Sequence, residues 1–210
     1  MLRTAANSFL LIFLLIVSCN IAYTPKPKGY FKIDFPERSY QVFDEPGFPY
    51  SFEYPTYATV AKNVEAEDNQ PYWLNVEFKG FNGRVYLSYK SVNGYSTYKV
   101  KQGDGYRDSL VKNNFEKLRD EAFNLTYKHT IKASGIVDSF FNPRPGYAGM
   151  YFYVDGNAAT SKQFFITDSV RHFLRGALYF DATPNEDSIK VVSDFLEADV
   201  KHLISTLKWK

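Results

Sequence analysis

The stretch Trp73-Leu-Asn-Val-Glu-Phe-Lys-Gly-Phe-Asn-Gly-Arg-Val-Tyr-Leu-Ser-Tyr-Lys90 decides the fold class. Apolar and polar residues alternate on both sides of Asn82-Gly83, a pair that is typical of tight β-hairpin turns. Side chains of a strand point alternately to the two faces of a sheet, so each half of the stretch has the period of a strand. We therefore expect two antiparallel strands, Trp73–Lys79 and Arg84–Lys90.

Outward from this hairpin, the rest of the chain shows strand patterns and two helical patterns. Further strands are expected at Tyr50–Tyr54, Tyr57–Val64, Ser134–Phe140, Tyr147–Asp155, Lys162–Asp168 and His172–Asp181. The 17 Tyr and 19 Phe residues agree with a large share of strand, because aromatic residues favour it. Apolar residues at three- and four-residue spacing predict a helix over Asp104–His129, capped by Asp104 or Ser109. A second helix is expected after Asn185, its N-cap.

The order of strands, helix, strands and helix predicts an α+β fold. We expect a single domain in which two long helices pack on an antiparallel β-sheet. Its predicted range is residues 30–210, preceded by a tether at 19–29 and a signal peptide at 1–18. No internal repeat and no second domain are indicated.

The N-terminus has the features of a bacterial lipoprotein precursor. Arg3 is followed by the apolar run Phe9–Val17, which suits a signal peptide but is shorter than the roughly 20 residues of a membrane span. Ile16-Val-Ser-Cys19 then matches a lipobox, whose cysteine sulfur receives a diacylglycerol. The alternative is an ordinary secretory signal with an incidental cysteine, but Cys19 is the only cysteine in the chain. Acyl chains such as palmitate on Cys19 would hold the protein on a membrane, since stable anchoring needs two chains.

Composition and motifs exclude several functional classes. The 25 basic and 23 acidic residues nearly balance, which argues against nucleic-acid binding. No catalytic or nucleotide-binding motif occurs, and the three histidines have no metal-ligand spacing. Without a second cysteine the mature domain has no thiol nucleophile and no disulfide. We therefore expect no enzymatic activity, no cofactor and no metal.

Five polar residues are candidate contact residues. Lys128 and His129 end the first predicted helix, where cations are favoured by the helix dipole. Gln163, Asp168 and Arg175 lie in strongly apolar strands that flank a tight turn, and charges in such surroundings are usually paired. The residues of the turn are interpreted either as a structural staple, by Asp–Arg pairing or Asp-to-backbone bonds, or as a docking surface for a partner. For Lys128 and His129 the alternative to a contact is simple capping.

Three tripeptides have the pattern Asp-Ser-apolar of Bacteroidetes periplasmic O-glycosylation. They place candidate sites at Ser109, Ser169 and Ser188. Two of them, Ser109 and Ser188, also fall at predicted helix starts, where Asp and Ser are expected for capping. Both interpretations stay open.

Four stretches together resemble the gliding-motility lipoprotein GldD family of Bacteroidetes. They are Pro25–Pro36, Tyr86–Lys90, Tyr127–Ala133, and Asn157–Ser169 continuing through Phe173–Phe180 to Pro184–Ile189. The segment from Lys90 to Lys112 departs from the family's pattern. The resemblance implies a cell-envelope component needed for gliding, a process coupled to type IX secretion, and it implies no catalytic residue.

Location and function follow from the lipobox and the resemblance. The tether lacks the acidic cluster that directs Bacteroidetes lipoproteins to the cell surface, and Asn20 is not the aspartate of inner-membrane retention. An outer-membrane lipoprotein facing the periplasm is therefore favoured over an inner-membrane one. We expect a non-enzymatic lipoprotein that assembles with or stabilises gliding and secretion lipoproteins or other envelope proteins. The alternative is a periplasmic lipoprotein that binds a glycan or lipid.

Overall fold

The predicted hairpin lies within a seven-stranded antiparallel sheet. The computed structural model of the chain describes residues 32–63 and 70–210, of which Asp34–Lys210 form one compact unit. In it β4 (Leu74–Phe78) pairs with β5 (Gly83–Ser91) across a turn in which Asn82 has a φ of 49°, a left-handed conformation. The predicted signal peptide, Cys19 and the tether at 19–29 lie outside the described residues.

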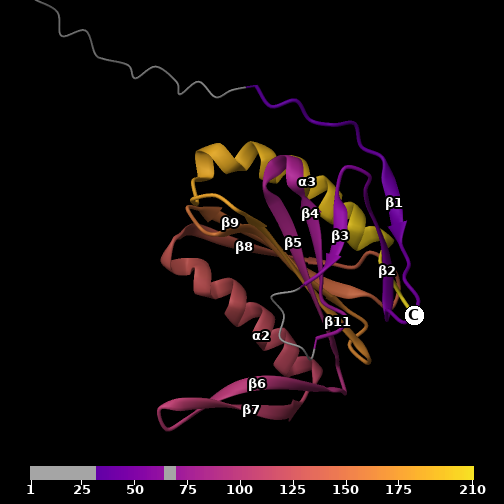
Figure 1. The fold of residues 1–210 in the computed structure, drawn as a ribbon, viewed down its shortest axis with the longest axis vertical. Coiled ribbons are helices and arrows are strands. Elements are labelled where there is room, and N and C mark those ends of the chain that lie inside the picture. Colours follow the sequence, from indigo (N-terminus) through magenta and orange to yellow (C-terminus); the bar gives the residue numbers. More distant parts are fainter. Residues whose placement is uncertain (1–31, 64–69) are drawn as a thin grey trace, which may run out of the picture. The chain divides into compact units, whose positions relative to one another are not determined.

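The sheet has the order β3-β4-β5-β11-β10-β9-β8, and every neighbouring pair is antiparallel (Figure 1). The remaining strands of this sheet are β3 (Thr59–Lys62), β8 (Ala133–Phe141), β9 (Ala148–Gly156), β10 (Thr160–Thr167) and β11 (His172–Phe180). The hairpin of β10 and β11 therefore lies at the centre, and β5 joins it to the β4–β5 hairpin. The antiparallel α+β fold expected from the sequence is confirmed.

Two smaller sheets accompany the large one. The first has the order β1-β2-β12, formed by β1 (Tyr40–Phe43), β2 (Tyr50–Pro55) and β12 (Lys208–Trp209). The second is a two-stranded ribbon of β6 (Tyr95–Gln102) and β7 (Gly105–Lys112). The sequence patterns predicted β2 but neither β1, nor β12, nor the ribbon.

The first helix is shorter than the sequence predicts. Its range is Phe115–Tyr127 (α2, 13 residues), and the one-turn 3-10 helix Lys128–Ile131 follows it. The side-chain oxygen of Asn114 accepts a hydrogen bond from the Lys117 N–H at 2.8 Å and begins the helix there. The predicted caps Asp104 and Ser109 are wrong, because the chain before Asn113 pairs as β7 with β6. Leu110 matched the helical period only by chance.

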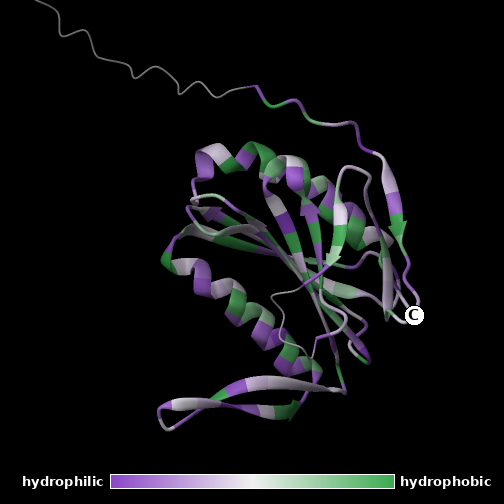
Figure 2. Cartoon of the chain, in the orientation of Figure 1, coloured by the Kyte–Doolittle hydropathy of each residue, from purple (hydrophilic) through white to green (hydrophobic). Residues whose placement is uncertain are grey.

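The second helix agrees with its prediction. It covers Glu186–Thr206 (α3, 21 residues), and Asn185 caps it by accepting from the Ser188 N–H at 3.3 Å. Figure 2 shows hydrophobic residues interleaved with hydrophilic ones along both helices, as expected for helices that cover one face of a sheet. Besides Lys128–Ile131, a second 3-10 helix, Lys79–Phe81, forms part of the turn between β4 and β5.

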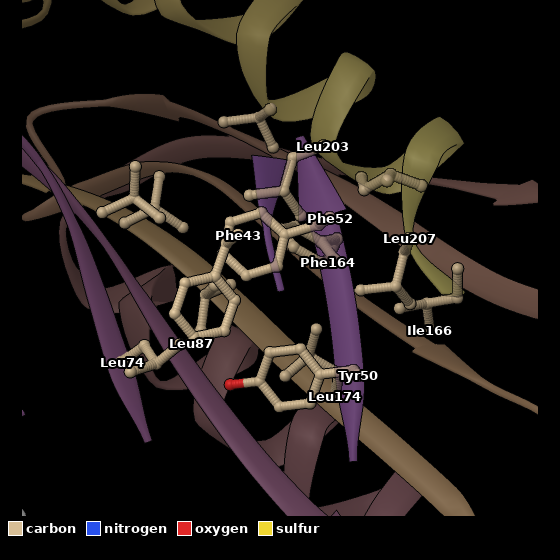
Figure 3. Close-up of a cluster of buried hydrophobic side chains, with 14 of the residues drawn as sticks. Phe43, Tyr50, Phe52, Leu74, Leu87, Phe164, Ile166, Leu174, Leu203 and Leu207 are labelled. Atoms are coloured by element: carbon tan, nitrogen blue, oxygen red, sulfur yellow. The ribbon is translucent and has the colours of Figure 1, made fainter. Parts of the chain in front are cut away.

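The two helices cover opposite faces of the sheet (Figure 1). In β10, Phe164 and Ile166 belong to the larger core beneath α3, whereas Phe165 belongs to a smaller core beneath α2. The larger core also takes in the first strands of the chain, and Figure 3 shows Phe43 and Phe52 gathered with side chains of α3 and of the sheet. The central strands are therefore buried on both sides.

A buried carboxylate ties the N-terminal strands to α3. Asp199 of α3 is 2% exposed and accepts a hydrogen bond from the Tyr40 hydroxyl at 2.9 Å and another from the Tyr57 hydroxyl. Arg38 supplies the opposite charge, with its Nε 3.4 Å from the carboxylate. Burial, together with the hydrogen bond to Asp199, raises the pKa of Tyr40 to about 12, so this phenol stays protonated and keeps donating.

Close packing between β10 and β11 gives a first test. Gly176 of β11 lies against the ring of Phe164, and a Cβ at this position would overlap that ring. We expect Gly176→Ala to lower the free energy of unfolding by about 1–3 kcal/mol through overpacking, measured by urea denaturation of the purified protein. Gly135→Ala, in β8 of the same sheet, is the matched control, because a Cβ there meets no atom within 4 Å. A Gly176→Ala protein as stable as the Gly135→Ala protein would contradict this account of the core.

Candidate functional site

A cavity of about 450 Å³ lies between α2 and the sheet, and we call it the α2 pocket. Alternate residues of β5 and β11 form its floor and one side of α2 forms its wall. Trp73, which precedes β4, contributes to the rim. The lining of the pocket includes Trp73, Tyr86, Ser88, Lys90, Arg175 and Tyr179.

One ion pair of the pocket is complete. The Lys90 ammonium of β5 lies 2.7 and 2.9 Å from the two carboxylate oxygens of Glu121 in α2. The Tyr98 hydroxyl of β6 donates to the same carboxylate at 2.9 Å. This carboxylate therefore holds α2, the sheet and the base of the ribbon together, and its charge is balanced by Lys90.

The guanidinium of Arg175 has only neutral hydrogen-bond partners. It donates to the side-chain oxygen of Gln163, which also accepts from the Thr126 hydroxyl at 3.1 Å, and it is hydrogen-bonded to Tyr179. Within the described part of the chain, no carboxylate lies within ion-pair distance of Arg175. Burial lowers the pKa of this guanidinium, because water no longer solvates the charge fully, while nearby Tyr179 and Glu121 act in the opposite direction.

His129 and Lys128 lie just beyond the end of α2, as the sequence predicts. The His129 Nε2 is 3.5 Å from the Tyr179 hydroxyl, which links it to the group around Arg175. Burial, and next the positive charge of Arg175, lower the pKa of His129, so the imidazole is neutral at pH 7. Lys128 is exposed.

Asp168 closes the turn between β10 and β11. One of its carboxylate oxygens accepts from three backbone N–H groups, those of Val170 at 3.0 Å, Arg171 at 2.8 Å and His172 at 2.8 Å. Burial acts to raise the pKa of Asp168, but these three donors outweigh it and hold the pKa below its usual value. Of the interpretations offered for this turn, the geometry matches the Asp-to-backbone staple. An Asp168–Arg175 pair does not form.

The structure therefore separates the five candidate residues. Gln163 and Arg175 are in direct contact, and His129 reaches them through Tyr179. Asp168 lies at the turn, at the opposite end of β11 from Tyr179. Their roles in function stay predictions.

The three candidate glycosylation sites occupy different settings. Ser109 is half-buried within β7, so it is not at a helix start as predicted. Ser169 is exposed in the turn after β10 with a φ of 63°. Ser188 is exposed in the first turn of α3, where its N–H is capped by Asn185. Modification of any of the three stays a prediction.

Several pocket residues escaped the sequence argument. Tyr86, Ser88 and Lys90 alternate with buried residues along β5 and face α2, but their pattern alone reads as an ordinary solvated face. Arg175 and Tyr179 are four residues apart, so they lie on the same face of β11. A charged residue and a phenol on one face of an apolar strand indicate a polar partner, and this pattern could have been found in the sequence. No sequence pattern marked Glu121 as a pocket residue, because its partner Lys90 lies far away in the sequence.

Comparison with known proteins identifies the family. The family model described as gliding motility lipoprotein GldD matches residues 20–209. This chain belongs to the GldD family. The family resemblance noted in the sequence is confirmed, and membership makes the protein a lipoprotein associated with gliding motility. Curated proteins give no significant match.

A solved structure with a similar course of the chain is that of cyanobacterial PsbP from Synechocystis sp. PCC 6803. It covers 88% of the GldD chain and 99% of its own, with 10% sequence identity and a TM-score of 0.43. For the GldD protein itself, no helix among residues 32–63 and 70–210 is long and apolar enough to cross a lipid bilayer. No group of three His, Cys, Asp or Glu in this part of the chain is arranged to hold a metal ion.

The turn staple gives a second test. We expect Asp168→Ala to lower the free energy of unfolding by about 1–3 kcal/mol, because three backbone donors lose a charged acceptor. The folded-state pKa of Asp168 is lowered, so its contribution is full above the unfolded-state value of about 3.9 and is lost as the pH falls through the folded-state value. Urea unfolding at a series of pH values should show the wild-type and variant stabilities converging in acid.

Asp138→Ala is the control, because Asp138 is exposed on the edge strand β8, and its effect should stay within about 0.5 kcal/mol. A constant difference between Asp168→Ala and wild type down to pH 2 would show that the carboxylate charge is not what stabilises the turn.

Proposed function

We propose that this GldD protein is a non-enzymatic lipoprotein of the cell envelope that assembles with, or stabilises, proteins of the gliding machinery and the coupled type IX secretion machinery. Family membership supports the link to gliding, and the lipobox at Cys19 supports a membrane anchor. The tether sequence favours the periplasmic face of the outer membrane. The absence of catalytic motifs supports a role in assembly rather than in catalysis.

The observation that carries the proposal is the exposed apolar face of the β6–β7 ribbon. Cross-strand pairing puts Tyr95, Leu110 and Tyr106 on one face of the ribbon, and their exposed fractions are 63%, 69% and 72%. The opposite face carries Tyr98, which holds the ribbon to α2 through Glu121. Large exposed apolar side chains gathered on one face are typical of protein interaction sites.

Few contacts with the rest of the described domain stabilise the β6–β7 ribbon. An isolated two-stranded hairpin is marginal in water, and this one is held at its base by few bonds. Asn113 donates to the Ser91 carbonyl at 3.0 Å and to the Ser96 hydroxyl at 2.8 Å, while residues from Lys99 to Asp108 are exposed. An exposed ribbon with apolar side chains on one face is suited to packing against a neighbouring protein.

Lysines give the same face its charge. Lys99, Lys101 and Lys112 lie on it with Asp108 as the one acidic residue, and the Lys99–Asp108 pair lies between Leu110 and Tyr106, so apolar and charged side chains alternate along the face. The complementary partner surface is therefore mixed, with apolar positions and a net negative charge. The turn between β10 and β11, the docking surface expected from the sequence, presents the single large exposed apolar side chain Val170.

A second function, binding of a small ligand, is supported by the α2 pocket. Its volume of about 450 Å³ lies within the range of known small-molecule sites, and polar groups converge on it. The two functions use different surfaces and do not exclude each other.

Crosslinking in gliding cells followed by affinity capture tests the assembly function. We expect wild-type protein to capture gliding or secretion components, and Tyr106→Ser with Leu110→Ser to lose most of that capture at normal protein abundance. Val191→Ser removes an exposed apolar side chain from α3 and is the matched control, which should capture partners normally.

Undiminished capture by the ribbon variant would exclude the ribbon as the contact. Loss of capture with Val170→Ser instead would place the contact at the β10–β11 turn, and crosslinks to lipid alone would show that the ribbon binds a membrane.

The anchor is tested separately. Cys19→Ser removes the sulfur that accepts the diacylglycerol, so we expect an unprocessed or soluble periplasmic protein and loss of gliding. Fractionation of the envelope and the spreading of colonies measure the two effects. A Cys19→Ser protein that remains in the membrane fraction and supports normal gliding would overturn the lipobox interpretation.

A further inference from the structure

Among the described residues that line the α2 pocket, Arg175 is the one cation that no carboxylate pairs with. Of the charged side chains that line it in the described part of the chain, Lys90 and Glu121 neutralise each other. Arg175 remains, and its hydrogen-bond partners Gln163 and Tyr179 are neutral. A guanidinium partly removed from water without a counter-ion is costly, and an anion that pairs with it recovers that cost.

Aromatic side chains lie beside this charge. The rings of Tyr86 and Tyr179 meet edge to face with their centroids 5.5 Å apart, and Trp73 lines the same pocket. The Trp73 indole N–H is already used, because it donates to the Tyr89 carbonyl at 3.0 Å. The ring of Trp73 is therefore available for apolar contact rather than for a further hydrogen bond.

We propose that the α2 pocket binds a small molecule with one carboxylate group, which pairs with Arg175, and with a planar or apolar body that lies against Tyr86, Tyr179 and Trp73. This inference rests on the second function proposed above and names the class of its ligand. It is independent of the partner surface on the ribbon.

Charge balance favours a carboxylate over a phosphate. The planar guanidinium can pair with either anion through two parallel hydrogen bonds, but one carboxylate balances its single charge. A phosphate monoester carries a charge between −1.5 and −2 at pH 7, so it would bring excess negative charge near Glu121. The described lining offers no second free cation, because Lys90 is engaged by Glu121.

Fluorine NMR of the mature lipoprotein in nanodiscs tests the inference with defined probes. The probes are 4-(trifluoromethyl)benzoate, the neutral 4-(trifluoromethyl)benzamide and 4-(trifluoromethyl)phenyl phosphate, titrated and followed by their linewidths. We expect the benzoate to bind at least about tenfold more tightly than either of the others, as a charge-assisted pair with Arg175 requires.

Variants locate the binding. Arg175→Gln should weaken the benzoate at least about tenfold and leave the benzamide unchanged. Arg84→Gln is the matched control, because Arg84 lies over the ring of Tyr86 but pairs with Asp181 outside the pocket, and it should bind the benzoate as wild type does. Ser88 is the cross-strand neighbour of Arg175, so Ser88→Phe places a ring in the pocket beside the guanidinium and leaves its charge in place. This variant should weaken both probes, so the test stands even if Arg175→Gln does not fold.

The outcomes separate the ligand class from the ligand-binding function. Equal binding of benzoate and benzamide, or undiminished benzoate binding by folded Arg175→Gln, would contradict a carboxylate ligand that pairs with Arg175. The ligand-binding function of the pocket would remain. Tighter binding of the phosphate overturns the carboxylate in favour of a phosphorylated ligand. Binding of no probe, or probe binding that Ser88→Phe does not weaken, overturns both the inference and the ligand-binding function.

Discussion

Burial of both faces of β10 and β11 is the constraint on which the rest of the structure depends. Their position at the centre of the seven-stranded sheet leaves neither face to water, so Phe164 and Ile166 need one cover and Phe165 needs another. Helix α3, with the β1-β2-β12 sheet, covers the first face, and α2 covers the second. Gly176 permits the close approach of the Phe164 ring within this hairpin, and Asp168 fixes its turn by satisfying three backbone donors. The central hairpin is therefore enclosed on both faces, and the other elements are arranged around it.

Helix α3 and the small sheet cover their face of the large sheet more completely than α2 covers the other face. The candidate site lies on the less covered face. On the α3 side the sheet is filled by a large aromatic and aliphatic core, closed at its edge by the buried Asp199 network. On the α2 side a helix of 13 residues covers less of the sheet. The polar faces of β5 and β11 then border a cavity instead of a core, and Arg175 lies there with neutral partners. The shorter helix on this side thus leaves room for the pocket, and Arg175 is the cation in its described lining that no carboxylate pairs with.

The ribbon of β6 and β7 stands outside this arrangement and adds a different kind of surface. Its inner face is used by Tyr98, which shares Glu121 with Lys90, so the base of the ribbon and the wall of the pocket depend on the same carboxylate. Its outer face exposes Tyr95, Tyr106 and Leu110. In a member of the gliding-motility lipoprotein family, this exposed apolar face supports the proposed contact with a partner protein.

The sequence by itself determined the elements whose cause is local. Period-two alternation and Asn82-Gly83 were enough for the β4–β5 hairpin, and Asn185 was enough for the start of α3, because strand faces, tight turns and N-caps depend on neighbouring residues. The lipobox and the family motifs are likewise local patterns. Only the tertiary structure decided the start of α2, since Leu110 and its neighbours pair with β6 instead of continuing a helical period. It also decided that Asp168 bonds the backbone and not Arg175, and that Lys90 meets Glu121. These choices depend on which strands become neighbours in the sheet, and a contact between residues distant in the sequence leaves no periodic trace in either segment.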